Sequence, residues 1–257
     1  MSGAADFIRE LAAEISELLF PSHLYCISCR RWIDEGQAYR LCDHCLASIR
    51  WATGRTCEIC GKVLSEHNPL ARCYSCREHP HRFRKGMTCT EYGPEVRSLL
   101  FAFKYHGRSD LAETMGEIAA DRWEASGEEE VPDLVVPIPL HPKKKRKRGY
   151  NQAGLFARAF AKRRGFAWDE ELLQRTRETA ALRGLSPNER KMELEGSFRV
   201  RPGREEEVRG RMILVVDDIY TTGATMDEAA RALLEAGASE VRILTLAAGG
   251  DVVKAEE

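Results

Sequence analysis

Eight of the nine cysteines in this chain of 257 residues fall into four C-x-x-C pairs, and their spacing constrains the fold more than any other feature. The pairs form two copies of one unit, which read CISCRRWIDEGQAYRLCDHC and CEICGKVLSEHNPLARCYSC. Each cysteine of the first copy recurs 31 positions later in the second. The first copy contains Cys26, Cys29, Cys42 and Cys45, and the second contains Cys57, Cys60, Cys73 and Cys76.

This spacing is typical of zinc sites. Each C-x-x-C turn presents two thiolates, and two such turns complete a tetrahedral site with four sulfur ligands. Because cysteine fills all four ligand positions, the zinc would be structural and not catalytic. We therefore expect two structural Zn²⁺ ions, although the spacing does not decide whether each copy closes its own site or the pairs interleave. A disulfide framework is the less favoured alternative, since nothing in the sequence suggests export.

The ninth cysteine and the nearby histidines are not expected to bind metal. Cys89 lies in MTCTEY, an apolar stretch with the pattern of a strand, and is expected to be a buried thiol. Five histidines close to the cysteine pairs are expected to be solvated loop residues. They are His23, His44, His67, His79 and His81.

The N-terminal segment MSGAADFIRELAAEISELLF predicts an amphipathic helix over residues 1–20. Its acidic residues lie among the apolar ones, unlike a signal peptide with a basic start and an apolar core. No run approaches the ~18 uncharged apolar residues of a membrane span, so we expect a cytoplasmic protein without membrane insertion. The net charge of −1 excludes a general polycation, and any anion binding must be local.

After the cysteine repeats the pattern changes to alternating strands and helices, which predicts an α/β fold with a doubly wound parallel sheet. We expect a double zinc-ribbon domain over residues 21–82 and a second domain over residues 83–257, with the polar segment REHPHRFRKG near the boundary. Strands are expected at residues 86–92, 133–139, 211–216 and 240–247. Helices are expected at residues 94–105, 110–125 (with Ser109 as its cap), 151–164 and 224–238.

The segment that follows the third expected strand carries the candidate chemistry. The buried run RMILVV ends at Asp217 and Asp218, and TTGAT follows just before a helix. In open α/β sheets, ligands bind at the carboxyl ends of strands. Backbone N–H groups, hydroxyls and a helix N-terminus suit a phosphate, while the acids can accept hydrogen bonds from sugar hydroxyls or hold a Mg²⁺-bound water. A ribose 5-phosphate fits this description.

The segment VVDDIYTTGAT resembles the signature of type I phosphoribosyltransferases, which bind phosphoribosyl pyrophosphate (PRPP). The resemblance implies a type I phosphoribosyltransferase-like sheet, which would follow the small N-terminal zinc-ribbon domain with four-cysteine sites expected from the cysteine repeat. It also implies that the two acids bind the ribose 2- and 3-hydroxyls and that the loop wraps the 5-phosphate. The implied PRPP-binding residues are Asp217, Asp218, Thr221, Thr222, Gly223, Ala224, Thr225 and Lys104.

Nearly the whole chain, residues 20–248, resembles the ComF family of bacterial competence-associated proteins. The paired cysteines, FKYHGR, VPIPLHPKKKRKRGYNQA and the signature carry the likeness. By position, VPIPLHP resembles the pyrophosphate loop, reaching Arg148. RTRETAALRGLSPNER resembles the flexible catalytic loop, in which Arg175, Thr179, Arg183 and Arg190 would close over pyrophosphate. The implied catalytic residues are Asp217, Asp218, Arg148, Arg183 and Arg190.

Two positions depart from the family pattern. A Gln is usual where this chain has Leu182, and an Asn is usual where it has Glu193. Both lie in the loop that would contact substrate or pyrophosphate, so they bear on whether transfer is retained.

Two functions agree with these features. The first is Mg²⁺-dependent transfer of ribose 5-phosphate to an acceptor with release of pyrophosphate, with Lys104, Arg148 and the loop arginines supplying positive charge. Ligand oxygens and water would hold most of the Mg²⁺ coordination. No segment identifies the acceptor. The second is a non-enzymatic module of DNA uptake that keeps a ligand-binding scaffold, binds single-stranded DNA and works with a helicase-like competence protein.

The basic run PKKKRKRG permits two interpretations. It is either a solvated, mobile part of the pyrophosphate loop or a contact for nucleic-acid phosphates. Aromatic residues among the arginines of the zinc-ribbon region, such as Trp32 and Tyr39, could stack bases, although packing around a small metal core is the slightly favoured explanation. The candidate nucleic-acid residues are Lys143, Lys144, Lys145, Arg146 and Lys147.

Overall fold

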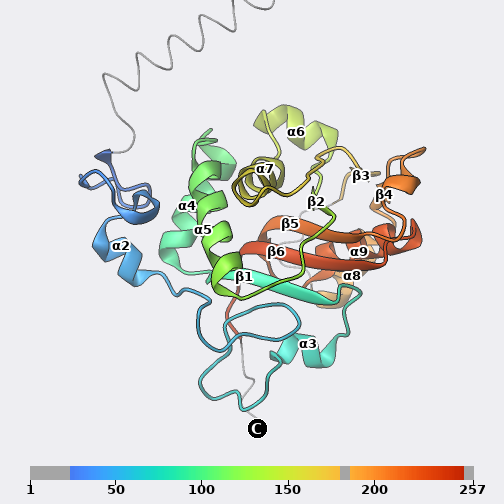
Figure 1. The fold of residues 1–257 in the computed structure, drawn as a ribbon, viewed down its shortest axis with the longest axis horizontal. Coiled ribbons are helices and arrows are strands. Elements are labelled where there is room, and N and C mark those ends of the chain that lie inside the picture. Colours follow the sequence, from blue (N-terminus) through green and yellow to red (C-terminus); the bar gives the residue numbers. More distant parts are fainter. Residues whose placement is uncertain (1–23, 180–185, 252–257) are drawn as a thin grey trace, which may run out of the picture. The chain divides into compact units, whose positions relative to one another are not determined.

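The computed structural model describes residues 24–179 and 186–251 (Figure 1). The helix expected over residues 1–20, His23, Leu182 and Arg183 lie outside the described residues. The chain divides into two compact units, Met1–Ser48 and Ile49–Glu257, and each is described here by itself. The second cysteine repeat belongs to the larger unit, while the domain boundary expected at residues 82 and 83 stays a prediction.

The described part of the smaller unit is built around the first cysteine repeat. The Cys26 N–H donates to the Arg31 carbonyl at 2.8 Å, and the Arg30 N–H donates to the Cys26 carbonyl at 3.0 Å, which closes the first C-x-x-C turn. Cys42 precedes a helix and Cys45 lies within it, so helix geometry fixes the second pair. The elements are the 3-10 helix η2 (Ala38–Arg40) and the helix α2 (Asp43–Ser48).

The larger unit contains a four-stranded sheet in which every neighbouring pair is parallel, as the alternating pattern predicted. The strand order is β1-β6-β5-β2. The run from Ile213 to Val216 in β5 is fully buried, because helices and other elements cover both faces of a parallel sheet. The strands are β1 (Lys85–Glu91), β2 (Leu134–Pro137), β5 (Met212–Tyr220) and β6 (Glu240–Ala248).

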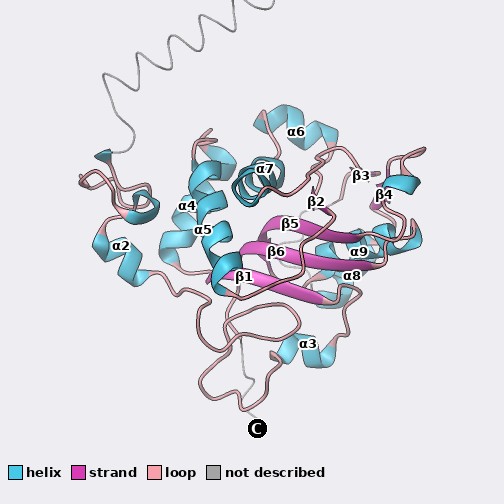
Figure 2. Cartoon of the chain, in the orientation of Figure 1, coloured by secondary structure: helices cyan, strands magenta, loops and turns pink. Residues whose placement is uncertain are grey.

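Helices lie on both sides of this sheet (Figure 2). On one side two helices approach closely, since a Cβ added at Gly116 would lie 2.6 Å from Ala159 Cβ. On the other side Ala229 and Leu233 join Ile213 in one hydrophobic cluster. The helices are α4 (Pro94–Tyr105), α5 (Leu111–Ala125), α7 (Gln152–Arg164) and α9 (Ala224–Glu235).

The second cysteine repeat packs into the same cluster as α9. Its four cysteines are buried there together with Phe83. Two short strands pair antiparallel beside the sheet and flank the segment that contains the undescribed residues 180–185. The remaining elements are α3 (Tyr74–Glu78), α6 (Pro142–Arg148), β3 (Leu173–Arg175), α8 (Pro187–Leu194), β4 (Phe198–Val200) and the 3-10 helix η3 (Glu205–Glu207).

Three local expectations differ from the structure. Strand β5 continues to Tyr220, so the two acids lie in the strand and not after it. The N-cap of α5 is Asp110 and not Ser109, and it makes no side-chain cap hydrogen bond. The basic run is a helix, α6 (Pro142–Arg148), and the residue that caps its C-terminus, Gly149, has a left-handed conformation (φ 89°).

Candidate functional site

The two acids at the end of β5 face different neighbours. Asp218 is buried, with 7 % of its surface exposed, and forms an ion pair with Lys104 at the end of α4. Its backbone N–H donates to Asp217 Oδ1 at 2.8 Å. Asp217 is half-buried. Lys104, which was expected among the PRPP-binding residues, therefore lies beside the acidic pair.

The charges of this cluster shift one another's ionisation. Burial, followed by the charge of Asp218, raises the pKa of Asp217 to about 8. Burial opposes the charge of Lys104, but Asp218 and Asp217 overcome it, so the pKa of Lys104 is raised. Lys104 therefore stays a cation, while the Asp217 carboxyl retains its proton near neutral pH.

The segment after β5 forms a tight turn into α9. Gly223 has φ +86°, a left-handed conformation that favours glycine, and α9 begins at Ala224. Arg190 from α8 donates from Nη1 to Thr221 Oγ1 at 3.3 Å. The predicted phosphate loop, Thr221, Thr222, Gly223, Ala224 and Thr225, thus joins a helix N-terminus, where unpaired backbone N–H groups favour an anion.

The underside of this loop rests on His81. The His81 side chain is only 1 % exposed, and its Nδ1 lies 2.7 Å from Asp227 Oδ2. Its Nε2 lies 3.1 Å from Tyr220 Oη. The expectation that His81 is solvated is wrong, because it is enclosed by residues that lie far away in the sequence. His44, His67 and His79 are exposed, as expected.

The two residues after Gly149 connect this part of the chain to α4 and to the loop after β2. The Tyr150 hydroxyl donates to the Phe103 carbonyl, next to Lys104. Asn151 Nδ2 donates to the Ile138 carbonyl at 3.1 Å. Sequence reasoning assigned no role to Tyr150 or Asn151, although both lie in the motif RGYNQ that carried the resemblance.

The described residues of the expected flexible loop approach the acidic pair from β3. Burial lowers the pKa of Arg175, and the nearby charge of Asp217 opposes that shift. Arg175 Nη2 donates to Thr179 Oγ1. Glu193, one of the two departures from the family pattern, accepts through its carbonyl oxygen from Arg177 Nη2 at 2.5 Å. The expected catalytic residue Arg183 is not among the described residues.

Part of the basic helix α6 is neutralised within the molecule. Lys143 pairs with Glu178 at 3.0 Å, and Lys145 pairs with Glu170 at 2.9 Å. Lys144 Nζ donates to the Thr179 carbonyl at 3.4 Å. Among the described residues, none forms an ion pair with Arg146 or Lys147, so these two cations keep their charge available.

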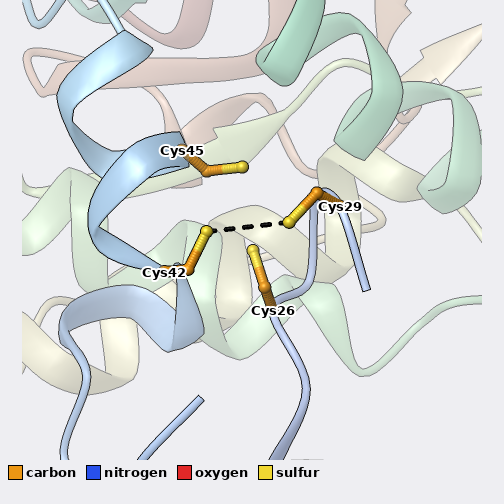
Figure 3. A group of neighbouring side chains, drawn as sticks. All are labelled: Cys26, Cys29, Cys42 and Cys45. Carbon is orange, nitrogen blue, oxygen red and sulfur yellow. Dashed lines mark hydrogen bonds between the residues drawn. The ribbon is translucent and has the colours of Figure 1, made fainter. Parts of the chain in front are cut away.

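Each cysteine repeat closes a site of its own. Within each group of four cysteines the sulfur atoms all lie within 4.8 Å of one another. Figure 3 shows the first group, Cys26, Cys29, Cys42 and Cys45. The Sγ atoms of Cys29 and Cys42 are 3.6 Å apart, and those of Cys60 and Cys73 are 3.7 Å apart. A tetrahedral zinc with Zn–S bonds of ~2.3 Å places its sulfurs roughly 3.8 Å apart. The clusters therefore fit two structural zinc ions, and the interleaved arrangement is excluded.

Within residues 24–179 and 186–251, every helix is too short or too polar to span a bilayer. The ninth cysteine, Cys89, is buried, and burial raises its pKa to about 12, as suits an unreactive core thiol.

Comparison with known proteins identifies two domain families. A double zinc ribbon domain matches residues 15–77, and a phosphoribosyl transferase domain matches residues 153–256. The chain is 31% identical to DNA utilization protein YhgH of Escherichia coli K12, covering 86% of this chain and 95% of that protein. It is 25% identical to competence protein F of Haemophilus influenzae (86% and 96%) and 28% identical to competence protein ComFC of Bacillus subtilis (80% and 83%).

One solved structure that resembles the chain is the glutamine PRPP amidotransferase of Bacillus subtilis complexed with ADP and GMP. The likeness has a TM-score of 0.38 at 18% identity and covers 56% of this chain and 30% of that one.

Proposed function

The chain belongs to the ComF family of competence-associated, phosphoribosyltransferase-like proteins, and we propose that it binds PRPP in the cytoplasm at the carboxyl end of β5. The observation that carries this proposal is the Lys104–Asp218–Asp217 cluster beside the loop of residues 221–225. A loop suited to one phosphate, next to two carboxyl groups, matches a ribose 5-phosphate group. The cations beside it match the pyrophosphate of PRPP.

Asp218 pairs with Lys104 through one carboxylate oxygen, Oδ2. Its other oxygen would accept a hydrogen bond from a ribose hydroxyl. Lys104, Arg148 and Arg175 would supply positive charge for the pyrophosphate. Mg²⁺, held mainly by ligand oxygens and water, would supply further positive charge beside the pyrophosphate.

The chemistry proposed for this site is transfer of ribose 5-phosphate to an acceptor. Positive charge develops on the ring as the bond from C1 to pyrophosphate breaks, and the Asp218 carboxylate would stabilise it. Cations around the pyrophosphate stabilise the departing negative charge. Arg190 of α8, which contacts Thr221, would place a cation beside the phosphate loop.

Calorimetric titration of the zinc-loaded protein with PRPP and Mg²⁺ tests the proposal. We expect binding in the micromolar range that is lost in the double variant Asp217→Asn/Asp218→Asn. Titration with pyrophosphate alone serves as a control for attraction by the cations. Absence of binding at millimolar PRPP would show that the signature persists only as a scaffold.

A second candidate function, binding of single-stranded DNA, is favoured by one surface of the larger unit. Phe101 and Tyr105 on α4 are 52% and 63% exposed, with ring centroids 4.9 Å apart. The Arg148 guanidinium lies 5.3 Å from the centroid of the Tyr105 ring, at the end of the basic helix α6. Exposed aromatic rings next to cations suit stacked bases and their phosphates.

Fluorescence anisotropy with a labelled oligonucleotide tests this second function. We expect Phe101→Ala/Tyr105→Ala to weaken binding at every salt concentration. Arg146→Ala/Lys147→Ala should instead reduce the slope of log affinity against log salt by about 1 to 2. Lys143→Ala is the matched control, since its charge is already paired with Glu178. Equal effects of Lys143→Ala and the double variant would contradict this interface.

A further inference from the structure

The two zinc ribbons have the same sequence spacing but different surroundings. All four cysteines of the second repeat are buried, and they share a hydrophobic cluster with the sheet and α9. In the first repeat Cys29 is exposed and Cys42 half-buried, and that repeat belongs to a separate compact unit. A duplicated sequence element therefore occupies two different structural positions.

The second ribbon lies directly on strand β1. Gly61 directly follows the pair Cys57/Cys60 and has φ +74°. A Cβ added there would lie 2.7 Å from both the Gly86 carbonyl oxygen and the Thr88 nitrogen. The Thr88 hydroxyl donates to the Cys60 carbonyl at 3.2 Å. The metal-binding turn and the sheet thus pack without space for any side chain between them.

From this ribbon the chain passes to the underside of the proposed phosphate loop. The His81 ring stacks on Phe83, with centroids 4.6 Å apart, and Phe83 belongs to the same cluster as the four cysteines. The Arg82 N–H donates to Asp227 Oδ1 at 2.9 Å, while His81 contacts the other carboxylate oxygen. His81 and Arg82, which lie between the second ribbon and β1, therefore both contact Asp227 in the first turn of α9.

The turn at Gly223 packs against His81 and Tyr220. A Cβ added at Gly223 would lie 2.6 Å from Tyr220 Oη and 2.7 Å from His81 Cε1. Tyr220 is buried, and its hydroxyl reaches His81 at 3.1 Å. The left-handed turn at Gly223 therefore packs directly against His81 and Tyr220, without space for a side chain.

We propose that the second zinc ribbon positions the 5-phosphate loop through His81, and that the first ribbon has no part in this. His81 is a positioning residue, since it would act through Gly223 and Asp227 and not touch the ligand. The proposal deepens the proposed function and rests on it for the identity of the ligand. It makes zinc in the second site a requirement for an ordered anion-binding loop.

Substitution of His81 in the full chain tests the connection. We expect His81→Ala to weaken PRPP–Mg²⁺ binding about tenfold and to speed amide hydrogen exchange at residues 221–225. His81→Asn can keep a donor near Nδ1 for Asp227 and should restore part of both. His79→Ala is the matched control, because His79 is exposed two residues away and should change neither.

The duplicated ribbon supplies a second, independent comparison. Cys26→Ser/Cys29→Ser and Cys57→Ser/Cys60→Ser should each remove one zinc, measured by metal analysis. Only the second variant should lose protection at residues 221–225 and affinity for PRPP. If residues 221–225 are equally protected from amide hydrogen exchange in both cysteine double variants and in His81→Ala, the proposal is overturned.

The two readouts separate this inference from the function on which it rests. If the unsubstituted protein fails to bind PRPP, the proposed ligand is wrong, yet loop protection in the His81 variants still decides the positioning role. If Cys57→Ser/Cys60→Ser does not fold, the comparison of His81→Ala with His79→Ala decides it. Unchanged protection in His81→Ala overturns the proposal whether or not PRPP binds.

Discussion

At the scale of single residues, the acidic pair is two groups with different tasks. Asp218 has a cationic partner in Lys104, whereas Asp217 has a raised pKa because it is surrounded by protein and lies beside another carboxylate. Neighbouring residues of a strand project toward opposite faces, so a pair that looks equivalent in sequence meets different elements. Ligand hydroxyls would therefore meet one charged and one largely protonated carboxyl at neutral pH.

The ionisation of Asp217 predicts a pH-dependent stability. Its folded pKa of about 8 lies above the ordinary value of 3.8, so the folded state binds the proton more tightly. Its contribution to the free energy of unfolding is complete below about pH 4 and is lost as the pH rises through 8. We expect Asp217→Asn to raise the Tm relative to the unsubstituted protein by a few degrees at about pH 8.5 but little at about pH 5, in thermal unfolding.

The neighbouring carboxylate gives the opposite expectation. Asp218→Asn leaves the half-buried Lys104 without its ionic partner and should lower the Tm at all pH values between about 5 and 9. A Tm difference for Asp217→Asn that is the same at every pH would show that its pKa is not raised.

At the scale of elements, the candidate site is one continuous segment of the chain, formed by strand β5, the loop and helix α9. The strand carries the carboxylates, the turn at Gly223 reverses the chain, and the helix presents its N-terminus. The turn is confined from below by Tyr220 and His81, so its geometry depends on the contacts of the loop as much as on its own sequence.

A pair of glycine substitutions separates these two contributions. Gly165 ends α7 with φ +70° and has no atom within 4 Å of an added Cβ, whereas Gly223 has φ +86° and three close contacts. Gly165→Ala should cost only the left-handed penalty of ~1–2 kcal/mol and leave PRPP affinity unchanged. Gly223→Ala should cost more and weaken PRPP binding at least about tenfold, measured by thermal unfolding and calorimetry. Equal effects of the two would mean that the contacts beneath the loop are unimportant.

At the scale of the whole molecule, the zinc-ribbon region is divided between two units. Residues 1–48 form one unit, and the second ribbon forms part of the hydrophobic cluster of the other. One four-cysteine site therefore belongs to the core of the larger unit, and the other belongs to the smaller unit.

This division predicts how the chain tolerates shortening. A fragment of residues 49–257 should fold and retain the PRPP affinity of the full chain. A fragment of residues 83–257, cut at the boundary that the sequence predicted, should be unstable, because it exposes the cluster that Cys57, Cys60, Cys73 and Cys76 help to bury. Circular dichroism and thermal unfolding of the two fragments check this, and a cooperative unfolding transition in both would contradict it.

The features determined by the sequence alone are those encoded at short range. The cysteine spacing specifies two sites with four sulfurs, since two C-x-x-C turns reach one ion. The alternation of apolar runs specifies the parallel sheet. The order of acids, threonines and glycine specifies a polar turn that joins a strand end to a helix N-terminus, and its role as a phosphate loop stays a prediction.

Tertiary structure alone decided how these parts work together. His81 meets Tyr220 and Asp227 across 139 and 146 positions, and no local pattern encodes contacts at that separation. In the same way Lys104 reaches Asp218 because α4 ends beside β5, and three cations of α6 contact neighbouring segments of the molecule. The two ribbons look alike in sequence because metal ligation is local, and they differ in the structure because burial depends on everything packed around them.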